Sequence, residues 1–245
     1  MTRKWKNEAE KQSVFLTRKV DRAIEQFNLI APGDRILVGV SGGKDSVSLL
    51  HLLNWRLKCA PDKYELVAAH VRGDARGPDV NVPDAFPRWL ESEGVPVVVR
   101  DIVLPEGEPL PMNCERCSRN RRRTLFEIAD EMGCNKVALG HNLEDFAHTA
   151  LINLFSSGKL ETMEFRRDYF GGKFSVIRPL AYVREHELVR YVRACDLPVY
   201  QTGCPLAATG RRKVARDLMH EVGRSFKSAN ANIVRAACRN DLVFE

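Results

Sequence analysis

The sequence predicts an α/β protein built on a doubly wound, mainly parallel sheet of five strands with helices on both faces. Short apolar runs rich in β-branched residues alternate along the chain with stretches whose apolar residues recur at helical spacing. This alternation is typical of βαβ units, in which helices cover a parallel sheet. A polar turn with two glycines also joins the first apolar run directly to a helical stretch, at residues 41–46. The chain has 245 residues, 44% of them hydrophobic, which suffices for one large domain with appendages.

The expected elements follow one another in a regular order. Strands are expected at residues 36–40, 64–71, 95–103, 136–140 and, after a hairpin over 165–179 with Gly171 and Gly172 at its tip, 174–177. Helices are expected at residues 8–28, 47–53, 85–93, 115–132, 143–155 and 184–195, with two more in the last forty residues. The third strand is nearly continuous in valine, which predicts a buried strand. We expect an N-terminal helical segment (1–32), a central domain (33–205) and C-terminal helices packed on it (206–245).

Composition narrows the classes of function. The net charge is +6 and the pI about 9.0, which favours a polyanionic partner. No apolar run approaches the ~18 residues of a membrane span, and the charged N-terminus lacks the apolar centre of a signal peptide. We therefore expect a cytoplasmic protein without a membrane partner. Seven cysteines in such a chain indicate a metal site or catalysis more than disulfides.

The segment Ser41-Gly42-Gly43-Lys44-Asp45-Ser46 is the first candidate site. It lies between a strand and a helix, where backbone N–H groups and the positive helix end bind phosphate. The glycines allow a close approach of backbone to anion, Lys44 adds a positive charge, and Ser41 and Ser46 add hydroxyl donors. The segment is not a Walker A motif, which needs four residues between its first Gly and its Gly-Lys pair. The alternative is a plain glycine turn that binds no nucleotide.

Cysteines form a second candidate site. Cys114 and Cys117 make a C-x-x-C at the start of a helix, where the helix end and the nearby Arg116 and Arg119 favour thiolates. Cys204 follows the last strand-like segment, so three thiolates could meet at one sheet edge and hold one metal centre. Zinc would need a fourth protein ligand, whereas an iron–sulfur cluster on three thiolates keeps one iron open. The alternative for the C-x-x-C is an accidental pair or a redox dithiol. The other cysteines are predicted to be small buried hydrophobes: Cys59, Cys134, Cys195 and Cys238.

A third candidate site opens a helix after the fourth strand, at Leu139–Asp145. Gly140 allows a close approach, and His141 and Asp145 lie one helical turn apart and share a face. A carboxylate here could hold Mg²⁺ on the phosphates of a nucleotide. The alternative is helix capping by Asn142, with acidic residues in the first turn. Because ligands bind beyond the carboxyl ends of parallel strands, the functional interpretation is favoured.

Basic residues are the fourth feature. The cysteine-bearing helix carries five arginines: Arg116, Arg119, Arg121, Arg122 and Arg123. Later segments add six basic residues: Arg166, Arg167, Arg211, Arg212, Lys213 and Arg216. Together they could follow a phosphate backbone, with salt-dependent affinity. The alternative is a set of solvated helix faces, since charge runs are common on exposed helices.

Together these motifs resemble one family. They are S-G-G-K-D-S, C-x-x-C-S-R-x-R-R, L-G-H-N-x-x-D, V-I-R-P-L-A-Y with Arg184 and Glu185, and a late Cys. In this combination the chain is similar to the tRNA 2-thiocytidine synthetases, which are PP-loop enzymes of the ATP-pyrophosphatase superfamily. The related T-loop tRNA 2-thiouridine synthetases carry terminal zinc fingers, which this sequence does not show, although Cys204-Pro205 is more like theirs. The resemblance runs from about Gly33 to Arg216.

The resemblance implies an adenine nucleotide α-hydrolase-like fold, ATP as substrate, Mg²⁺, a [4Fe–4S] cluster and a tRNA. Carried over by motif, the cluster ligands are Cys114, Cys117 and Cys204, and these join Lys44 and Asp145 as the catalytic residues. The ATP site comprises Ser41, Gly42, Gly43, Lys44, Asp45, Ser46, Gly140, His141 and Asp145, with His70 and Val71 near the adenine. Glu144 replaces the first Asp of the family's D-D pair and keeps its charge.

The implied activity is ATP-dependent tRNA thiolation, with the C2 oxygen of an anticodon-loop cytidine as the target. Sulfide or a cysteine desulfurase is the implied sulfur donor, and the N-terminal helix could serve a homodimer or the tRNA. Three alternatives stay open. They are sulfur insertion into another tRNA uridine or a small molecule, a lysidine-synthase-like adenylating enzyme, and a nucleotide-binding module without turnover. The lysidine-like enzyme would not need the three cysteines, and a small-molecule enzyme would not need the arginines.

Overall fold

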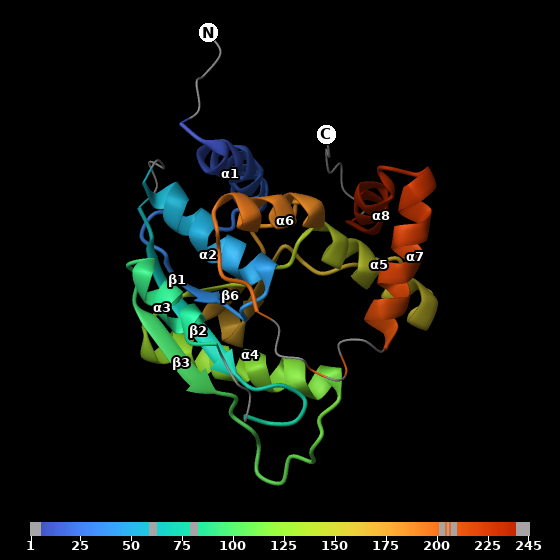
Figure 1. Ribbon diagram of the computed structural model, residues 1–245. Helices are drawn as coiled ribbons and strands as arrows, with labels where there is room; N and C mark the ends of the chain where they lie inside the picture. Colours follow the sequence, from blue (N-terminus) through green and yellow to red (C-terminus); the bar gives the residue numbers. More distant parts are fainter. Residues whose placement is uncertain are drawn as a thin grey trace.

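The computed structural model describes residues 6–58, 63–78, 83–200, 204, 206 and 210–238. Within them the strands form a six-stranded sheet in the order β3-β2-β1-β4-β6-β5 (Figure 1). The parallel strands are β1 (Arg35–Gly39), β2 (Glu65–Arg72), β3 (Val97–Asp101), β4 (Lys136–Ala138) and β6 (Phe174–Ile177). The edge strand β5 (Arg166–Tyr169) runs antiparallel to β6. The predicted class, a mainly parallel doubly wound α/β fold, is confirmed.

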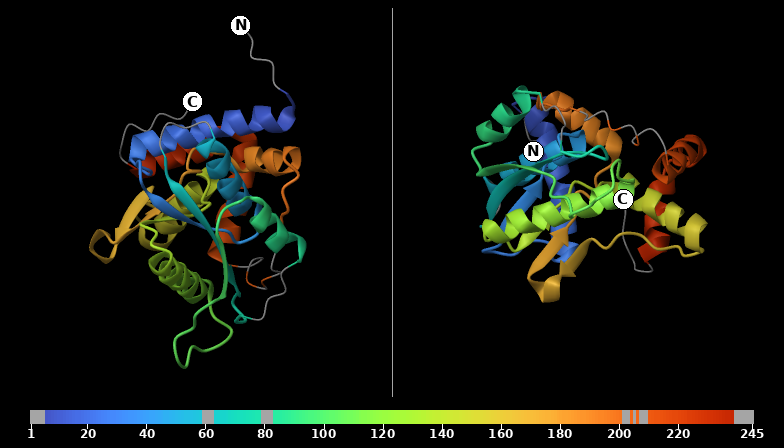
Figure 2. Two further views of the ribbon diagram at one scale, coloured as in Figure 1. Left: turned by 90° about the vertical axis from the view of Figure 1, so that its left-hand side faces the viewer. Right: turned by 90° about the horizontal axis from the view of Figure 1, so that it is seen from below.

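Alternation along the strands separates two apolar layers. Ile36 and Val38 of β1 face one side of the sheet, and Leu37 faces the other. The first side packs under α2 (Lys44–Leu57), α3 (Ala85–Ser92) and α6 (Glu185–Ala194), and the second side packs on α4 (Cys114–Glu131). Outside these layers lie α1 (Glu8–Phe27), across α2 and α6, and the group of α5 (Leu143–Ser157), α7 (Arg211–Ser225) and α8 (Ala229–Cys238) to one side (Figure 2). Helices therefore cover both faces, as predicted.

Two details of the predicted sheet are wrong. The structure has six strands rather than five because the first arm of the predicted hairpin, β5, also pairs with β6. The valine-rich β3 is an edge strand rather than a buried one, and Val99 is 43% exposed. Valine favours strands at edges as well as in centres, so the run predicted a strand but not its depth.

The direction of chain addition to the sheet reverses beside β1. From β1 the chain adds β2 and β3 on one side, and it then returns to add β4 and β6 on the other. The loops that follow β1 and β4 therefore leave the same edge of the sheet next to each other. In open parallel sheets this switch point is where ligands bind.

The N-terminal helix shares the main core. Leu16 and Val20 of α1 are fully buried in the same apolar cluster as residues of α2 and α6. The helix starts at the capping side chain of Asn7 and ends at Asn28, which adopts a left-handed conformation. The domain boundaries near residues 32 and 205 stay a prediction. No helix in the described part of the chain is both long and apolar enough to cross a membrane.

Replacing Leu16 by Ala is expected to lower the unfolding free energy by about 2–5 kcal/mol, because the side chain is fully buried in this cluster. Phe15→Ala is the matched control on the same helix, since Phe15 is 46% exposed and its loss should have a much smaller effect. Urea unfolding followed by circular dichroism measures both. Equal effects of the two substitutions would contradict the placement of α1 in the core.

Candidate functional site

The loop after β1 is held in shape by its own serines. The hydroxyl of Ser46 donates to the carbonyl of Gly43 at 3.0 Å and accepts the backbone N–H of Ser41, also at 3.0 Å. Because the Ser46 hydroxyl donates its proton to the carbonyl of Gly43, it stabilises the loop and has no second proton to donate to a ligand. Helix α2 starts at Lys44 without a side-chain cap, so the N–H groups of its first turn are the ones an anion would take.

The two loop glycines have different roles. At Gly42 (φ +89°) a Cβ would lie 2.0 Å from the ring of Tyr200, so this space is filled by a side chain rather than left for an anion. At Gly43 a Cβ would meet only the hydroxyl of Ser41, at 3.6 Å. Of the two positions predicted to face a phosphate, Gly43 therefore offers the open approach.

Gly140 joins the third candidate site to the first. A Cβ at this position would lie 2.9 Å from backbone atoms of Asp45 and of Ser46. The glycine therefore lets the turn after β4 rest directly on the start of α2. This contact brings the two predicted sites into one, as the sheet topology requires.

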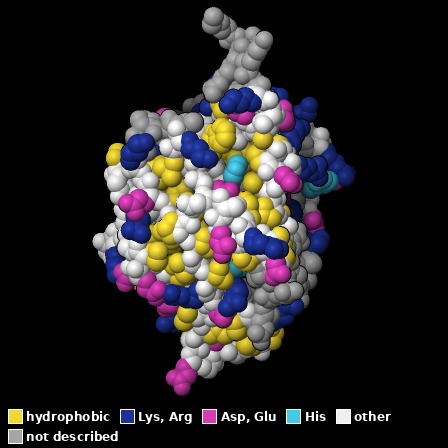
Figure 3. All heavy atoms as spheres, turned by 60° about the vertical axis from the view of Figure 1, so that its left-hand side comes forward, with side chains coloured by type: hydrophobic (Ala, Val, Ile, Leu, Met, Phe, Trp, Pro, Cys, Tyr) yellow, Lys and Arg dark blue, Asp and Glu magenta, His cyan; other side chains and the backbone are white. Residues whose placement is uncertain are grey.

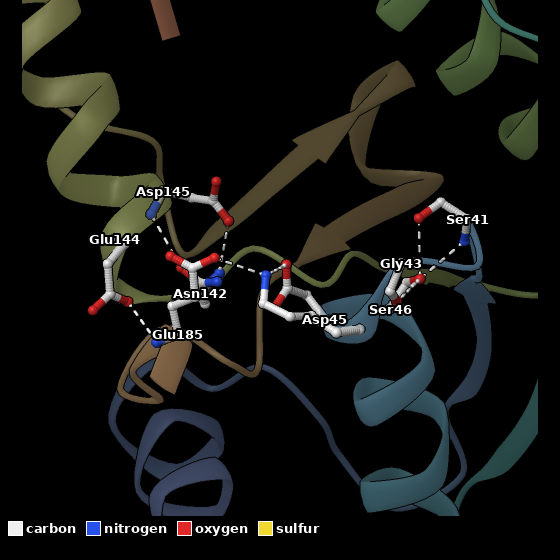
Figure 4. Close-up of polar contacts among 9 residues, drawn as sticks. Ser41, Gly43, Asp45, Ser46, Asn142, Glu144, Asp145 and Glu185 are labelled. Atoms are coloured by element: carbon white, nitrogen blue, oxygen red, sulfur yellow. Dashed lines mark hydrogen bonds and ion pairs between the residues drawn. The ribbon is translucent and has the colours of Figure 1, made fainter. Parts of the chain in front are cut away.

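Carboxylates gather around Lys44 where these loops meet. The Lys44 ammonium lies 2.8 Å from Glu185 Oε1 and 3.3 Å from Asp45 Oδ2. Burial alone would lower the pKa of Lys44, but the two carboxylates outweigh it and raise the pKa, so the side chain is a cation. Figure 4 shows Asp45, Asp145 and Glu185 between the start of α2 and the start of α5, whereas Glu144 lies to one side and accepts the backbone N–H of Glu185.

Asp45 and Asp145 are the oxygen donors that suit a metal ion here. Burial raises the pKa of Asp45 against the charge of Lys44, and the charge of Asp145 raises it further. Among the described residues, Asp45 Oδ1 is buried and has no hydrogen-bond partner. Burial raises the pKa of Asp145 as well. Mg²⁺ prefers carboxylate oxygens of this kind and would compensate their charges.

Asp145 also caps its own helix. Asn142 accepts the backbone N–H of Asp145 at 3.2 Å, and Asp145 Oδ2 accepts the backbone N–H of Asn142 at 3.1 Å. The predicted alternative of helix capping is therefore present in the structure. It uses one carboxylate oxygen, so the two interpretations of Asp145 are compatible.

His141 is deeply buried beside basic side chains. Burial, aided by the charges of Arg178 and Arg212, lowers the pKa of His141 to about 3. Its Nδ1 atom has no hydrogen-bond partner among the described residues. His141 is therefore a neutral imidazole near pH 7 and can offer a ligand a hydrogen bond but no charge.

His70 and Val71, expected near the adenine, are both buried in β2. The Nδ1–H of His70 donates to the carbonyl of Val40 at 2.7 Å, and Nε2 accepts the hydroxyl of Tyr200 at 2.9 Å. Both ring nitrogens of His70 already form hydrogen bonds, so a hydrogen bond from His70 to adenine would have to come from its backbone. The role of both residues at the adenine stays a prediction.

The three cysteines of the second candidate site come from two segments. Cys114 is the first residue of α4 and is exposed, whereas Cys117 and Cys204 are half-buried. Burial raises the pKa of Cys117 against the charge of Arg121, and the charges of Cys204 and Cys114 raise it further. Cys204 and Cys114 are therefore each near enough to Cys117 to influence its charge.

The expectation that the helix end, Arg116 and Arg119 make thiolates is wrong for Cys117. Arg116 pairs with Glu108 at 3.0 Å and Arg119 pairs with Glu115 at 2.8 Å, so both charges are directed to carboxylates. Burial then decides the direction of the pKa, and Cys117 is a thiol near neutral pH.

No three His, Cys, Asp or Glu side chains of the described residues already stand in a metal-binding arrangement. Metal binding by Cys114, Cys117 and Cys204 would thus draw the sulfurs closer together, and their role as ligands stays a prediction. Of the other cysteines, Cys134 is buried as predicted, Cys195 and Cys238 are half-buried, and Cys59 lies outside the described residues.

Besides Arg116, which pairs with Glu108, the arginines of α4 fall into two groups. Arg119 and Arg123 form exposed ion pairs with glutamates four residues away, at 2.8 and 3.0 Å, as on any solvated helix face. Arg121 and Arg122 instead donate to a carbonyl of β2 at 3.1 Å and a hydroxyl of β5 at 3.4 Å. On the face seen in Figure 3, acidic and basic side chains are interspersed. That face therefore presents no surface of a single charge.

Sequence reasoning missed two contributions to the site. Tyr200 fills the space beside Gly42, and no local spacing links these distant positions. Arg76 binds the buried Asp74 at 2.6 Å, and the charge of Asp74, with a smaller part from Cys204, raises the pKa of Arg76. The loop around residues 73–78 therefore lies near the cysteines. No local spacing in the sequence links this loop to the cysteines.

Comparison with known proteins agrees with this geometry. The PP-loop domain family matches residues 15–202. A tRNA-cytidine(32) 2-sulfurtransferase of Geobacter sulfurreducens is 38% identical over 224 residues, which cover 89% of this chain and 86% of that protein. One of Neisseria meningitidis is also 38% identical, with 92% and 72% covered. The solved U34-tRNA thiolase NcsA from Methanococcus maripaludis, with its [4Fe-4S] cluster, has the same fold at a TM-score of 0.74 and 22% identity, covering 93% of this chain and 79% of that one.

Glu144→Gln is expected to make the stability of the fold less dependent on pH. Burial raises the pKa of Glu144 to about 7 from 4.5, although the backbone N–H of Glu185 donates to it at 2.8 Å. The folded state therefore binds the proton more tightly, and the wild type loses stability as the pH rises from about 5 to about 8. Over this pH range, the urea concentration at the unfolding midpoint should fall for the wild type relative to that of Glu144→Gln. A constant difference between the two proteins would contradict the raised pKa.

Proposed function

The chain belongs to the PP-loop family and groups with its tRNA-cytidine(32) 2-sulfurtransferases, and on that premise we propose that it replaces the C2 oxygen of a tRNA cytidine by sulfur. It is an ATP-dependent tRNA sulfurtransferase, in which transfer of AMP to the oxygen precedes its replacement. The observation that carries this proposal is the PP-loop at the start of α2 in a chain that also has Cys114 and Cys117 on the first turn of α4, with Cys204 near enough to raise the pKa of Cys117.

The first step makes the C2 oxygen a leaving group. This oxygen attacks the α phosphorus of ATP, the bond from that phosphorus to the pyrophosphate oxygen breaks, and pyrophosphate leaves. The N–H groups of the first turn of α2 and the ammonium of Lys44 stand where they can hold the charge of the pyrophosphate. Asp45 and Asp145 would hold Mg²⁺, which neutralises phosphate charge when bound.

The second step replaces AMP. The sulfur of hydrosulfide bonds to C2, the C2–O bond breaks, AMP leaves with the oxygen, and the hydrosulfide proton passes to solvent. A [4Fe–4S] cluster on three thiolates supplies an iron without a protein ligand, at which sulfide can be held. Cys114, Cys117 and Cys204 fit this group in their chemistry, because iron–sulfur clusters are held by cysteine thiolates. Binding would draw the sulfurs together and displace the proton that burial keeps on Cys117.

The tRNA is the remaining partner in this proposal. Arg121 and Arg122, which hydrogen-bond to uncharged groups, are better candidates for phosphate contacts than Arg119 and Arg123, which belong to exposed ion pairs. Arg116 would have to leave Glu108 to contact a phosphate. We place the reaction in the cytoplasm, with sulfide or a cysteine desulfurase as the donor. A homodimer stays a prediction.

Substituting Cys114, Cys117 or Cys204 by Ser should lower sulfur incorporation into tRNA by more than about 100-fold, since even groups that only support metal ligands change activity by about 10–100-fold. ATP-dependent pyrophosphate release should persist. Anaerobic purification, iron and sulfide analysis and mass spectrometry of tRNA nucleosides measure these outcomes. Cys195→Ser is the control, because Cys195 is a half-buried thiol of α6's C-terminal end. Thiolation that survives in all three variants, or incorporation of an amine, would overturn the proposal.

Asp145→Asn should lower pyrophosphate release by about 100-fold, because it removes charge at the metal ion and phosphates. The amide keeps an oxygen for the backbone N–H of Asn142, so the helix cap is retained. Asp168→Asn, on β5, is the control for loss of a carboxylate outside the site. Pyrophosphate release at the wild-type rate in D145N, measured with tRNA and ATP, would remove Asp145 from the reaction.

A further inference from the structure

Tyr200, the last residue of the described range 83–200, contacts the PP-loop. Its backbone N–H donates to the carbonyl of Gly42 at 3.0 Å, and its hydroxyl lies 2.9 Å from His70 Nε2. Its ring packs edge-to-face on Phe86, with the ring centres 4.9 Å apart. A single side chain thus contacts the loop, β2 and α3.

The hydrogen bonds give these contacts a direction. The carbonyl of Val40 can only accept, so the proton of His70 is on Nδ1 and Nε2 is the acceptor. Tyr200 is therefore the donor, and burial raises its pKa to about 12, so it keeps its proton near pH 7. Val40 directly precedes the loop and Gly42 lies within it. Both ends of this chain of hydrogen bonds are consequently attached to the PP-loop segment.

The loop is shaped to accept this ring. A Cβ at Gly42 would lie 2.0, 2.4 and 2.6 Å from three ring atoms of Tyr200, so no larger residue fits there without moving the tyrosine. The neighbouring Gly43 is open toward a ligand. If bound phosphate displaced the backbone of Gly42 and Gly43, the Tyr200 ring that packs on Gly42 would therefore have to move as well.

Cys204 lies four residues after Tyr200. An extended chain rises about 3.3–3.6 Å per residue, so Cys204 stays within about 14 Å of the anchored tyrosine. Cys114 and Cys117, by contrast, are fixed by α4 and its capping residue Asn113. Of the three predicted ligands, Cys204 is therefore the one whose position depends on the contact with the PP-loop.

We propose that Tyr200 is a positioning residue that ties Cys204 to the nucleotide loop, so that occupancy of the loop changes the accessibility of the Cys204 thiol. The proposal rests on the proposed function, since it joins the ATP site to the sulfur site. Tyr200 itself takes part in neither reaction step. Its effect is to limit how far the third ligand can lie from the PP-loop.

The test measures thiol reactivity in the full-length apoprotein, without tRNA or turnover. Isotope-coded iodoacetamide and peptide mass spectrometry give the alkylation rates of Cys204 and Cys114 in one sample. Tyr200→Phe removes the hydrogen bond to His70 and should speed alkylation of Cys204 by about fivefold, the effect of one net hydrogen bond. Tyr200→Ala also removes the ring and should speed it further. The rate at Cys114, the internal control, should not change.

A second arm adds a nonhydrolysable ATP analogue with Mg²⁺. The analogue should change the alkylation rate of Cys204 in the wild type and leave it unchanged in Tyr200→Ala, while calorimetry shows that both proteins bind it. Equal Cys204 rates in all three proteins without nucleotide, or equal acceleration at Cys114, would overturn the inference. Absence of nucleotide binding in the wild type would instead overturn the proposed function, because the first arm uses no nucleotide.

Discussion

The turn after β4 rests directly on the first turn of α2, and the rest of the site depends on this contact. A Cβ at Gly140 would lie 2.9 Å from the backbone of Asp45 and Ser46, so only glycine permits the approach. Parallel pairing of β1 with β4 brings the two loops to one edge, and the missing side chain sets how closely they meet. The carboxylates of Asp45 and Asp145, and the charges around Lys44, are neighbours as a result.

This closeness has an electrostatic consequence in the protein without ligands. Burial raises the pKa of Asp45 and of Asp145, so the charged form of each carboxylate is disfavoured. Burial raises the pKa of Cys117 in the same way, with a contribution from its neighbouring sulfurs. Groups that stabilised the fold by ion pairing would show the opposite shift. Both clusters therefore behave as sites whose charge a bound cation would compensate.

The order of elements and the meeting of the PP-loop with the turn after β4 were predictable, because alternation and the position of loops after strands are local signals. Other features depended on distant contacts. The sequence assigned Gly42 to phosphate, whereas its open space holds the ring of Tyr200. The sequence predicted a thiolate at Cys117 because arginines lie nearby. Arg116, however, pairs with Glu108, a contact that the spacing of these residues does not reveal. The valines of β3 predicted a strand but did not indicate whether another strand lay beyond it, and β3 is an edge strand.

Gly42 and Gly43 face two different kinds of neighbour. The carbonyl of Gly42 accepts the N–H of Tyr200, and the next residue is open toward an anion. A ligand that shifts this pair therefore acts on Tyr200 and on the chain that leads to Cys204. Thiolation requires adenylation before sulfur is added, since the C2 oxygen must first become a leaving group. Coupling between two sites needs a physical element whose arrangement both ligands affect, and we propose the contact of Tyr200 with the loop as that element.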